Sequence, residues 1–161
     1  MTLFMMVGIP GSGKTTYAKN LKSYFEFERK NENYHIDYVS RDEIRFSLLK
    51  DGEPYFSREN EVYRIFTHMI KKGLKEGHDV IADATHITWG SRHKLIRSIH
   101  GIDNVKIVAI VMNPPYAVCE ARNMKREGRA QVPISQLRRM FEQFEYPQIE
   151  EGFERIDEVW Y

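Results

Sequence analysis

The chain has 161 residues, a mass of 19.1 kDa and a formal net charge of +1, with 42% hydrophobic and 29% charged residues. These values fit one folded domain and exclude a disordered or low-complexity chain. The small net charge also excludes nucleic-acid binding through a global positive field, so any such binding needs a local basic patch.

The sequence contains no apolar stretch long enough to cross a bilayer, since the longest one covers only residues 107–112. The apolar run at 3–7 lacks the basic lead-in and the cleavage site of a secretory signal. A single cysteine, Cys119, cannot form an internal disulfide. We therefore expect a cytoplasmic protein with no membrane contact and no obligate protein partner.

Apolar runs, helical spacing and turn residues predict alternating strands and helices. In chain order, we expect a strand at 3–7, a helix at 14–27, a strand at 34–39, helices at 41–49 and 57–76, a strand at 78–82, a helix at 89–98, a strand at 106–112, helices at 115–127 and 134–144, and a short strand at 156–160. Strands that are apolar throughout and alternate with helices predict an α/β fold, with a parallel sheet covered on both faces. One domain spans residues 1–161.

The stretch GIPGSGKTT at residues 8–16 follows the first predicted strand and opens a predicted helix. Parallel sheets bind ligands at the carboxyl ends of their strands, and this spacing turns backbone N–H groups toward a polyphosphate. Lys14 would reach the β- and γ-phosphates, and the Thr15 hydroxyl would bind Mg²⁺. The expected nucleotide-binding residues of this loop are Gly8, Gly11, Ser12, Gly13, Lys14, Thr15 and Thr16.

The second predicted strand is followed by Asp42 and Arg45, three residues apart at the start of a helix, so that they share one face. Asp42 could accept the proton of a hydroxyl acceptor, and Arg45 could hold an anionic acceptor. The alternative is that Asp42 only stabilises the positive end of the helix dipole. We assign that structural role to Glu43, which with Ser40 forms a capping-box pattern.

The third predicted strand leads into Asp83, where P-loop proteins place an acid that orients Mg²⁺. We expect Asp83 at the metal, the alternative being an ordinary acid at a strand end. Thr85 and Arg92 follow and are expected to contact the acceptor. His86 is an alternative general base, although the carboxylate of Asp42 is preferred.

The fourth predicted strand and its helix lead into a basic segment that contains Arg122, Arg126 and Arg129. Arg122 and Arg126 are four apart, which predicts one helical face, and Arg129 follows the possible hinge at Gly128. We expect a small basic lid at about 123–133 that closes cations over the transferred phosphoryl group. The alternative is a solvated helix face.

Four aromatic residues lie in or before the predicted helix at 57–76, on the acceptor side. They could stack a nucleobase, although their spacing favours packing in the core. They are Tyr55, Phe56, Tyr63 and Phe66.

The segments GIPGSGKTT, SRDEIR, IADATH and ARNMKREGRAQVP together resemble the small P-loop kinases typified by the kinase domain of phage polynucleotide 5′-hydroxyl kinase. The resemblance runs from residue 3 to about 147 and implies an adenylate-kinase-like sheet of strand order 2-3-1-4-5. It implies that Asp42 is the base for a 5′-hydroxyl and that Arg45 holds the acceptor's 3′-phosphate. It also implies that Arg126 contacts the ATP phosphates and that Arg122 lies near the adenine.

Two positions depart from the family pattern. The strand-end acid of the family aligns with Ala84, one position after Asp83, and the lid has one extra residue between Arg126 and Val132.

The sequence thus predicts a phosphotransferase that uses ATP, or another NTP, with Mg²⁺. The expected acceptor is a hydroxyl, first of all the 5′-hydroxyl of a polynucleotide or nucleotide. One alternative is a kinase for a small-molecule hydroxyl or for aminoacyl-tRNA. Another, of a different class, is a regulator that binds ATP and transfers nothing.

Overall fold

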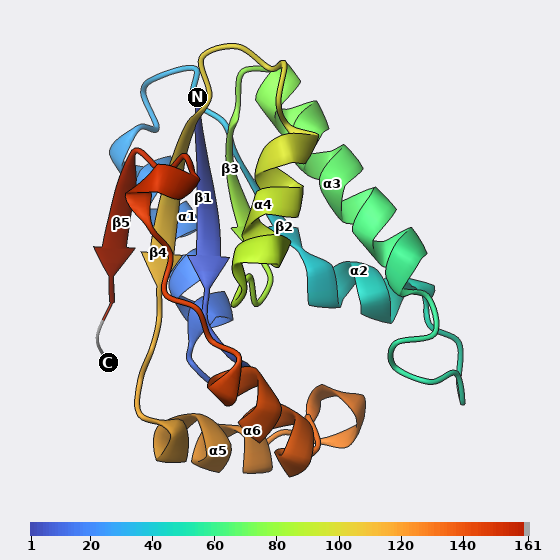
Figure 1. Ribbon diagram of the computed structural model, residues 1–161. Helices are drawn as coiled ribbons and strands as arrows, with labels where there is room; N and C mark the ends of the chain where they lie inside the picture. Colours follow the sequence, from blue (N-terminus) through green and yellow to red (C-terminus); the bar gives the residue numbers. More distant parts are fainter. Residues whose placement is uncertain (160–161) are drawn as a thin grey trace.

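The computed structural model describes residues 1–159, in which strands and helices alternate in the predicted order (Figure 1). The strands are β1 (Thr2–Val7), β2 (Ile36–Ser40), β3 (Asp79–Asp83), β4 (Lys106–Val111) and β5 (Arg155–Glu158). The α-helices are α1 (Lys14–Glu28), α2 (Arg41–Leu48), α3 (Glu59–Lys75), α4 (Trp89–Ser98), α5 (Tyr116–Met124) and α6 (Ile134–Glu142). Two 3₁₀ turns, η1 (Gly128–Ala130) and η2 (Ile149–Glu151), complete the set.

The five strands form one sheet of order β2-β3-β1-β4-β5, and every neighbouring pair is parallel. This confirms the predicted α/β fold and strand order. At the centre, Leu3 of β1 lies between Val80 of β3 and Ile107 of β4. The carboxyl ends of all five strands therefore lie on the same side of the sheet, the lower side in Figure 1.

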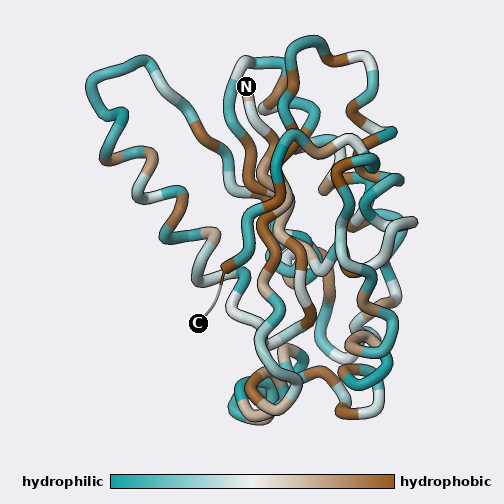
Figure 2. Tube along the Cα trace, turned by 60° about the vertical axis from the view of Figure 1, so that its left-hand side comes forward, coloured by the Kyte–Doolittle hydropathy of each residue, from teal (hydrophilic) through white to brown (hydrophobic). Residues whose placement is uncertain are grey.

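Helices cover both faces of the sheet, as predicted. Alternate residues of β1 point to opposite faces, so Leu3, Met5 and Val7 join the core beneath α3 and α4. Phe4 and Met6 join the core beneath α1. Figure 2 shows the resulting hydrophobic segments gathered at the centre of the molecule.

A third apolar cluster lies below the carboxyl edge of the sheet, where α5 and α6 pack together (Figure 1). It contains Ile9 of the loop after β1, Cys119 of α5 and Leu137 of α6. This cluster anchors α5 and α6 beside the loop that follows β1, so the basic segment after α5 is held close to the predicted phosphate site.

Several boundaries differ from the sequence-based ones. Helix α3 begins at Glu59 rather than at 57, because residues 55–58 form turns in which Ser57 N–H donates to the Pro54 carbonyl. Helix α5 ends at Met124 rather than at 127. Strand β5 covers 155–158, and Trp160 of the predicted strand lies outside the described residues.

Within residues 1–159, none of the helices combines the length and the apolar character that a membrane span requires.

Candidate active site

In the glycine loop after β1, the backbone at position 11 has a conformation and surroundings that only glycine accommodates. Gly11 has φ +82°, and a Cβ there would lie 2.4 Å from the backbone oxygen of Cys119. The loop therefore packs directly on the backbone of α5. At the same time Gly8 N–H donates to the carbonyl of Thr85, which fixes the loop to the segment after β3.

The start of α1 carries the features of an anion site. The first N–H groups of a helix have no partner within the helix, and α1 has neither a side-chain cap at Gly13 nor an acid in its first turn. A small cavity of about 70 Å³ opens at this point. Its lining residues are Gly11, Gly13, Lys14, Thr15, Thr16 and Arg126.

Lys14 is buried within the loop. Its Nζ donates to the Ile9 carbonyl at 2.9 Å and lies 3.4 Å from Oγ of Ser12, which is itself buried. Burial lowers the pKa of Lys14, and the charge of Asp83 opposes this effect. A phosphate group would replace these neutral partners with a negative one, so the site favours an anionic ligand.

Asp83, at the end of β3, lies directly against the loop. Its Oδ2 accepts hydrogen bonds from the Thr15 hydroxyl at 2.7 Å and from the Tyr38 hydroxyl at 2.8 Å. A hydroxyl and a carboxylate are hard oxygen donors of the kind that Mg²⁺ prefers. This contact brings together the two residues that the sequence proposed for the metal, despite the offset of Asp83 from the family pattern.

The acceptor side is built on α2. Ser40 caps this helix by accepting a hydrogen bond from Glu43 N–H, and the Glu43 carboxylate pairs with Lys19 at 3.0 Å. The first turn of α2 presents Asp42, and its side chain forms an ion pair with that of Arg45, three residues further along the helix. The predicted common face of these two residues is therefore present.

Two further residues complete the environment of Arg45. Glu59, the first residue of α3, accepts from Nε of Arg45 at 2.6 Å and from Arg41 at 2.8 Å. The Tyr55 hydroxyl accepts from Nη1 of Arg45 and donates to Oδ1 of Asp42, both at 2.9 Å. Arg45 is only 5% exposed, whereas the Asp42 side chain is 60% exposed.

The glycine loop and α2 line one pocket of about 220 Å³. Lys14, Thr15 and Asp83 line it from the loop side, and Asp42 and Arg45 line it from α2. Thr85 is half-buried and lines the same pocket. The remaining lining residues include Pro10, Arg41, Tyr55, Phe56, Glu59, Ala84, Arg126, Ala130, Val132 and Met140.

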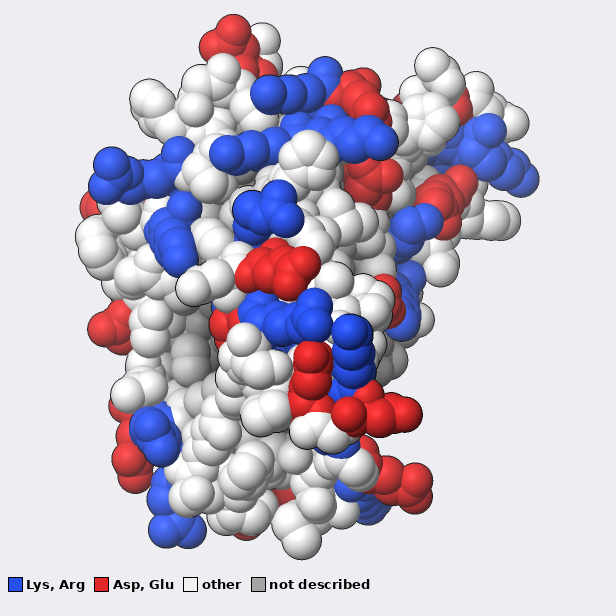
Figure 3. Space-filling model, turned by 90° about the vertical axis from the view of Figure 1, so that its right-hand side faces the viewer, with Lys and Arg blue, Asp and Glu red and all other residues white. Residues whose placement is uncertain are grey.

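Charges of both signs are mixed around this region. On the face formed by α3 and the connection from α2, Lys and Arg side chains lie next to Asp and Glu side chains (Figure 3). The cationic groups of the pocket therefore act locally, which agrees with the small net charge of the chain.

The basic segment reaches the loop, but its geometry is not the predicted one. Because α5 ends at Met124, Arg126 does not share a helical face with Arg122. Arg122 instead lies with Nη1 3.4 Å from the Gly11 carbonyl, while Arg126 lines both the 70 Å³ cavity and the larger pocket. Arg129 lies farther out, 3.3 Å from the Lys50 carbonyl.

The buried side chain of Asn123 holds the two ends of this basic segment together. Its amide donates to the Val132 carbonyl at 2.7 Å and accepts from Val132 N–H at 3.0 Å. This pair of bonds closes the segment from 124 to 131 into a loop and turns it back toward α6.

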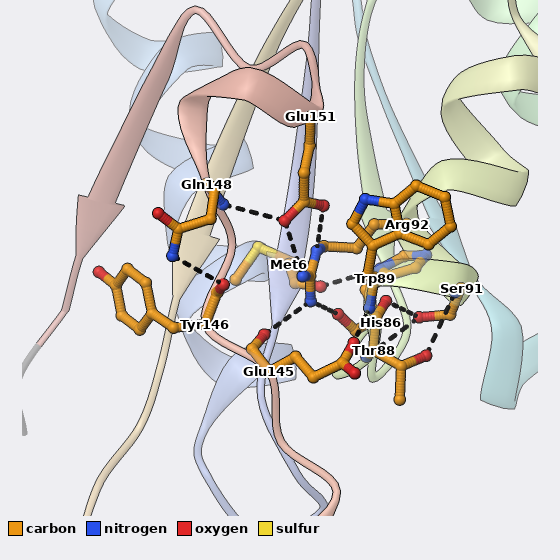
Figure 4. A network of polar contacts seen from close by, with 10 residues as sticks. All are labelled: Met6, His86, Thr88, Trp89, Ser91, Arg92, Glu145, Tyr146, Gln148 and Glu151. Carbon is orange, nitrogen blue, oxygen red and sulfur yellow. Dashed lines mark hydrogen bonds and ion pairs between the residues drawn. The ribbon is translucent and has the colours of Figure 1, made fainter.

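Arg92 corrects the sequence-based prediction. The sequence predicts that Arg92 contacts the acceptor. In the structure this residue of α4 is fully buried, and its guanidinium points toward Glu145 and Glu151 (Figure 4). Nε and Nη2 form a bidentate pair with Glu151 at 2.7 and 2.8 Å, and Nη1 donates to the carbonyls of His86 and Glu145. These partners take four of the five N–H donors of the guanidinium, so Arg92 serves to join α4 to the segment before β5.

His86 is excluded as the general base by the same network. The ring is buried, and its Nδ1 donates to the Met6 carbonyl at 2.9 Å. Burial lowers the pKa of His86 to about 4, so the imidazole is neutral at pH 7. It does not line the pocket that holds Asp42.

Sequence reasoning did not identify Tyr38, Glu59 or Asn123. Each acts through a contact with a residue remote in the chain, and the spacing of the sequence carries no signal for it. Tyr55 and Phe56 were interpreted mainly as core residues, yet both line the pocket, because they precede α3 rather than belonging to its buried face. Phe66, by contrast, is fully buried as expected.

Comparison with known proteins agrees with this arrangement. The family model described as "AAA domain" (AAA_33) matches residues 3–147. A relative from Autographa californica nuclear polyhedrosis virus, named "Putative bifunctional polynucleotide kinase/RNA ligase", is 22% identical over 155 residues. That match covers 88% of this chain and 20% of the relative, so the chain spans about a fifth of the relative's length.

Two solved structures share the fold. The Pnkp1/Rnl/Hen1 RNA repair complex contains a chain that is 25% identical, with a TM-score of 0.70, covering 88% of this chain and 43% of that one. Kti12 of Chaetomium thermophilum, solved with ADP-AlF3, is 18% identical with a TM-score of 0.74, covering 98% and 88% of the two chains. The matches support a P-loop kinase fold that resembles polynucleotide kinase.

Proposed function

We propose, from the premise that this chain belongs to the AAA domain family, that it transfers the γ-phosphoryl group of ATP or another NTP to the 5′-hydroxyl of a polynucleotide or nucleotide. The observation that carries the proposal is the shared pocket of about 220 Å³. Lys14 and Thr15, which would bind the phosphates, line this pocket together with a carboxylate and a guanidinium, those of Asp42 and Arg45. The relative from the baculovirus and the RNA repair complex support a nucleic-acid acceptor.

The donor side would hold the triphosphate through the N–H groups at the start of α1, Lys14 and Arg126. Thr15 and Asp83 would hold Mg²⁺, directly or through water, and bound Mg²⁺ neutralises phosphate charge. Arg122, beside the Gly11 carbonyl, lies at the outer side of the loop, where the nucleoside of ATP would leave the phosphate cradle.

Phosphoryl transfer then requires little beyond positioning. The acceptor oxygen forms a bond to the γ-phosphorus while the bond from that phosphorus to the β,γ-bridging oxygen breaks and ADP leaves. Asp42 takes the proton of the hydroxyl. Arg45 binds a phosphate of the acceptor next to this base, with Glu59 and Tyr55 fixing its orientation.

An acceptor screen with γ-labelled ATP tests this function. It compares 5′-hydroxyl oligonucleotides, nucleoside 3′-monophosphates, tRNA and sugars. We expect label on the first two, and no label with Lys14→Gln or Asp42→Asn. ATP hydrolysis without label on any 5′-hydroxyl would reject the proposed acceptor.

The compact size of the pocket favours, as a second candidate, a kinase for a small-molecule hydroxyl. This reading, and its variant with aminoacyl-tRNA, would give label on sugars, small molecules or tRNA in the same screen. A small neutral acceptor would also show no salt dependence beyond that of ATP itself, whereas polynucleotide binding weakens as salt rises.

The variant Asp42→Asn distinguishes a kinase from a regulator that binds ATP and transfers nothing. Since Asp42 lies on the acceptor side, the variant should keep the ATP affinity of the wild type and lose transfer to an acceptor. An unchanged turnover of ATP in Asp42→Asn, with no acceptor found, would favour the regulator.

A further inference from the structure

We propose that Tyr55 and Phe56 form a stacking site for the nucleobase of the acceptor's terminal nucleotide. The inference rests on the proposed function and names the part of the acceptor that this side of the pocket would recognise. It assigns to the two aromatic rings between α2 and α3 a role beyond the hydrogen bonds that the Tyr55 hydroxyl makes with Asp42 and Arg45.

The two rings belong to a compact aromatic cluster. Tyr55 and Phe56 meet edge to face, with ring centroids 4.7 Å apart at 90°, and Phe46 of α2 meets Tyr55 at 5.9 Å. The Arg45 guanidinium lies 4.5 Å from the Tyr55 centroid and 5.5 Å from that of Phe56. Cation–π contacts of this kind hold the rings next to the charged part of the pocket.

Phe56 is 47% exposed although it is apolar, and it lines the pocket together with Tyr55. Exposure of a large aromatic ring at the wall of a polar site costs hydrophobic free energy that burial in the core would avoid. An aromatic face open to a pocket is the feature that proteins use to stack bases. Phe56 thus packs on Tyr55 through part of its surface, and the rest of its surface is open to solvent and available to a ligand in the pocket.

The position of Tyr55 connects this face to the reacting group. Its hydroxyl is hydrogen-bonded to Asp42, the proposed base, so its ring is held one hydrogen bond from the site of proton transfer. Burial, followed by the charge of Asp42, raises the pKa of Tyr55 to about 12, so the hydroxyl stays protonated and keeps this bond at neutral pH. In a nucleotide the base and the 5′-hydroxyl lie on the same ribose, so a hydroxyl at Asp42 carries its base toward these rings.

The chain provides a matched control in Phe46. Its ring is 43% exposed and contacts Tyr55, as the ring of Phe56 does, but Phe46 does not line the pocket. A substitution at Phe46 therefore removes a similar exposed ring from the same cluster without removing a pocket wall.

The experiment crosses enzyme variants with two acceptors. Both acceptors are 5′-hydroxyl oligonucleotides of one sequence, and one carries a tetrahydrofuran abasic analogue as its 5′-terminal nucleotide. The variants are Phe56→Ala, Phe56→Leu, Phe56→Trp and Phe46→Ala. Steady-state labelling from γ-labelled ATP gives kcat/KM for each pair, and thermal melting with ATP titration checks that each variant folds.

We expect Phe56→Ala to lower kcat/KM about 10-fold on the intact oligonucleotide and less than 2-fold on the abasic one. Phe56→Leu, which keeps an apolar side chain without an aromatic face, should lose nearly as much, and Phe56→Trp should retain activity. Phe46→Ala should change neither acceptor by more than about 2-fold.

Equal losses on the two acceptors would overturn the stacking site while leaving the kinase activity intact. A base-dependent loss in Phe46→Ala as large as in Phe56→Ala would also overturn it, because the effect would then belong to the cluster as a whole. If the wild type labels neither oligonucleotide, the proposed function itself fails, and the stacking site fails with it.

Discussion

Arg45 and Arg92 follow neighbouring strands of the sheet, both are almost fully buried, and both pair with a glutamate. The sequence suggested the same role for both. Around Arg92, the carboxylate of Glu151 is 4% exposed and the other partners are backbone carbonyls. Around Arg45, the carboxylate of Asp42 is largely exposed and opens into a pocket.

The comparison shows that burial of an arginine does not decide its role. What decides it is whether the groups bound to the guanidinium are exposed to a pocket or buried. A guanidinium whose partners are a buried carboxylate and backbone carbonyls joins two segments of the chain and has a structural role. A guanidinium whose partners face a pocket can exchange them for a ligand anion, at little cost because those partners regain water. The following changes break or sharpen this comparison, from the largest expected effect to the smallest.

Among these changes, loss of the Arg92–Glu151 ion pair should lower the free energy of unfolding the most. Arg92→Met leaves the Glu151 carboxylate buried without its partner, so we expect the free energy of unfolding to fall by about 3–5 kcal/mol. Urea denaturation measures this loss. The double variant Arg92→Met, Glu151→Leu should recover part of it, because no buried charge remains.

The KM for the acceptor, measured on the folded Arg92→Met protein, tests the alternative that Arg92 contacts the substrate. If the KM for the acceptor rises while stability stays unchanged, Arg92 belongs to the substrate site after all, and the contrast with Arg45 disappears.

The burial of His86 should also make stability depend on pH. Its pKa is about 4 in the folded protein and 6.5 in the unfolded chain, so between these values the unfolded state binds the extra proton. The contribution of His86 is therefore complete above pH 6.5 and falls as the pH drops toward 4, by about 3 kcal/mol.

His86→Asn isolates this contribution, since asparagine tolerates the positive φ of 43° at this position. Urea denaturation at several pH values should show a flatter decline below pH 6.5 in the variant than in the wild type. Parallel declines would assign the acid sensitivity to other groups.

Arg45→Lys should act on the acceptor rather than on the fold. Lysine keeps the charge but cannot bind Glu59, Asp42 and a ligand phosphate at once with a planar group. We expect the KM for a nucleoside 3′-monophosphate to rise about 10- to 100-fold, with unchanged affinity for ATP. The same penalty on an acceptor that lacks the 3′-phosphate would refute phosphate binding by Arg45.

Tyr55→Phe should have the smallest effect. It removes the hydroxyl that bonds both Asp42 and Arg45 but keeps the aromatic ring, so two hydrogen bonds at the pocket wall are lost. We expect kcat/KM for the acceptor to fall about 5-fold, and the urea midpoint to stay that of the wild type. A loss near that of Asp42→Asn would make the hydroxyl part of the reacting centre.

The sequence by itself determined the features that local chemistry controls. The spacing of glycines before Lys14 and Thr15 sets the loop, because glycine alone permits its backbone and close packing. Apolar strands that alternate with helices set the parallel sheet, and the cap at Ser40 sets the start of α2, which puts Asp42 and Arg45 on one face. These features depend on residues that are close in the chain, so a pattern can reveal them.

Only the tertiary structure decided which partner each charged group meets. Arg92 pairs with Glu151, 59 positions away, and Asp83 accepts hydrogen bonds from Tyr38 and Thr15, which lie 45 and 68 positions away. The early end of α5 likewise depends on Asn123 meeting the backbone of Val132. Local spacing places a side chain on a face, but the packing of distant segments determines whether that face opens to a ligand or closes on another part of the chain.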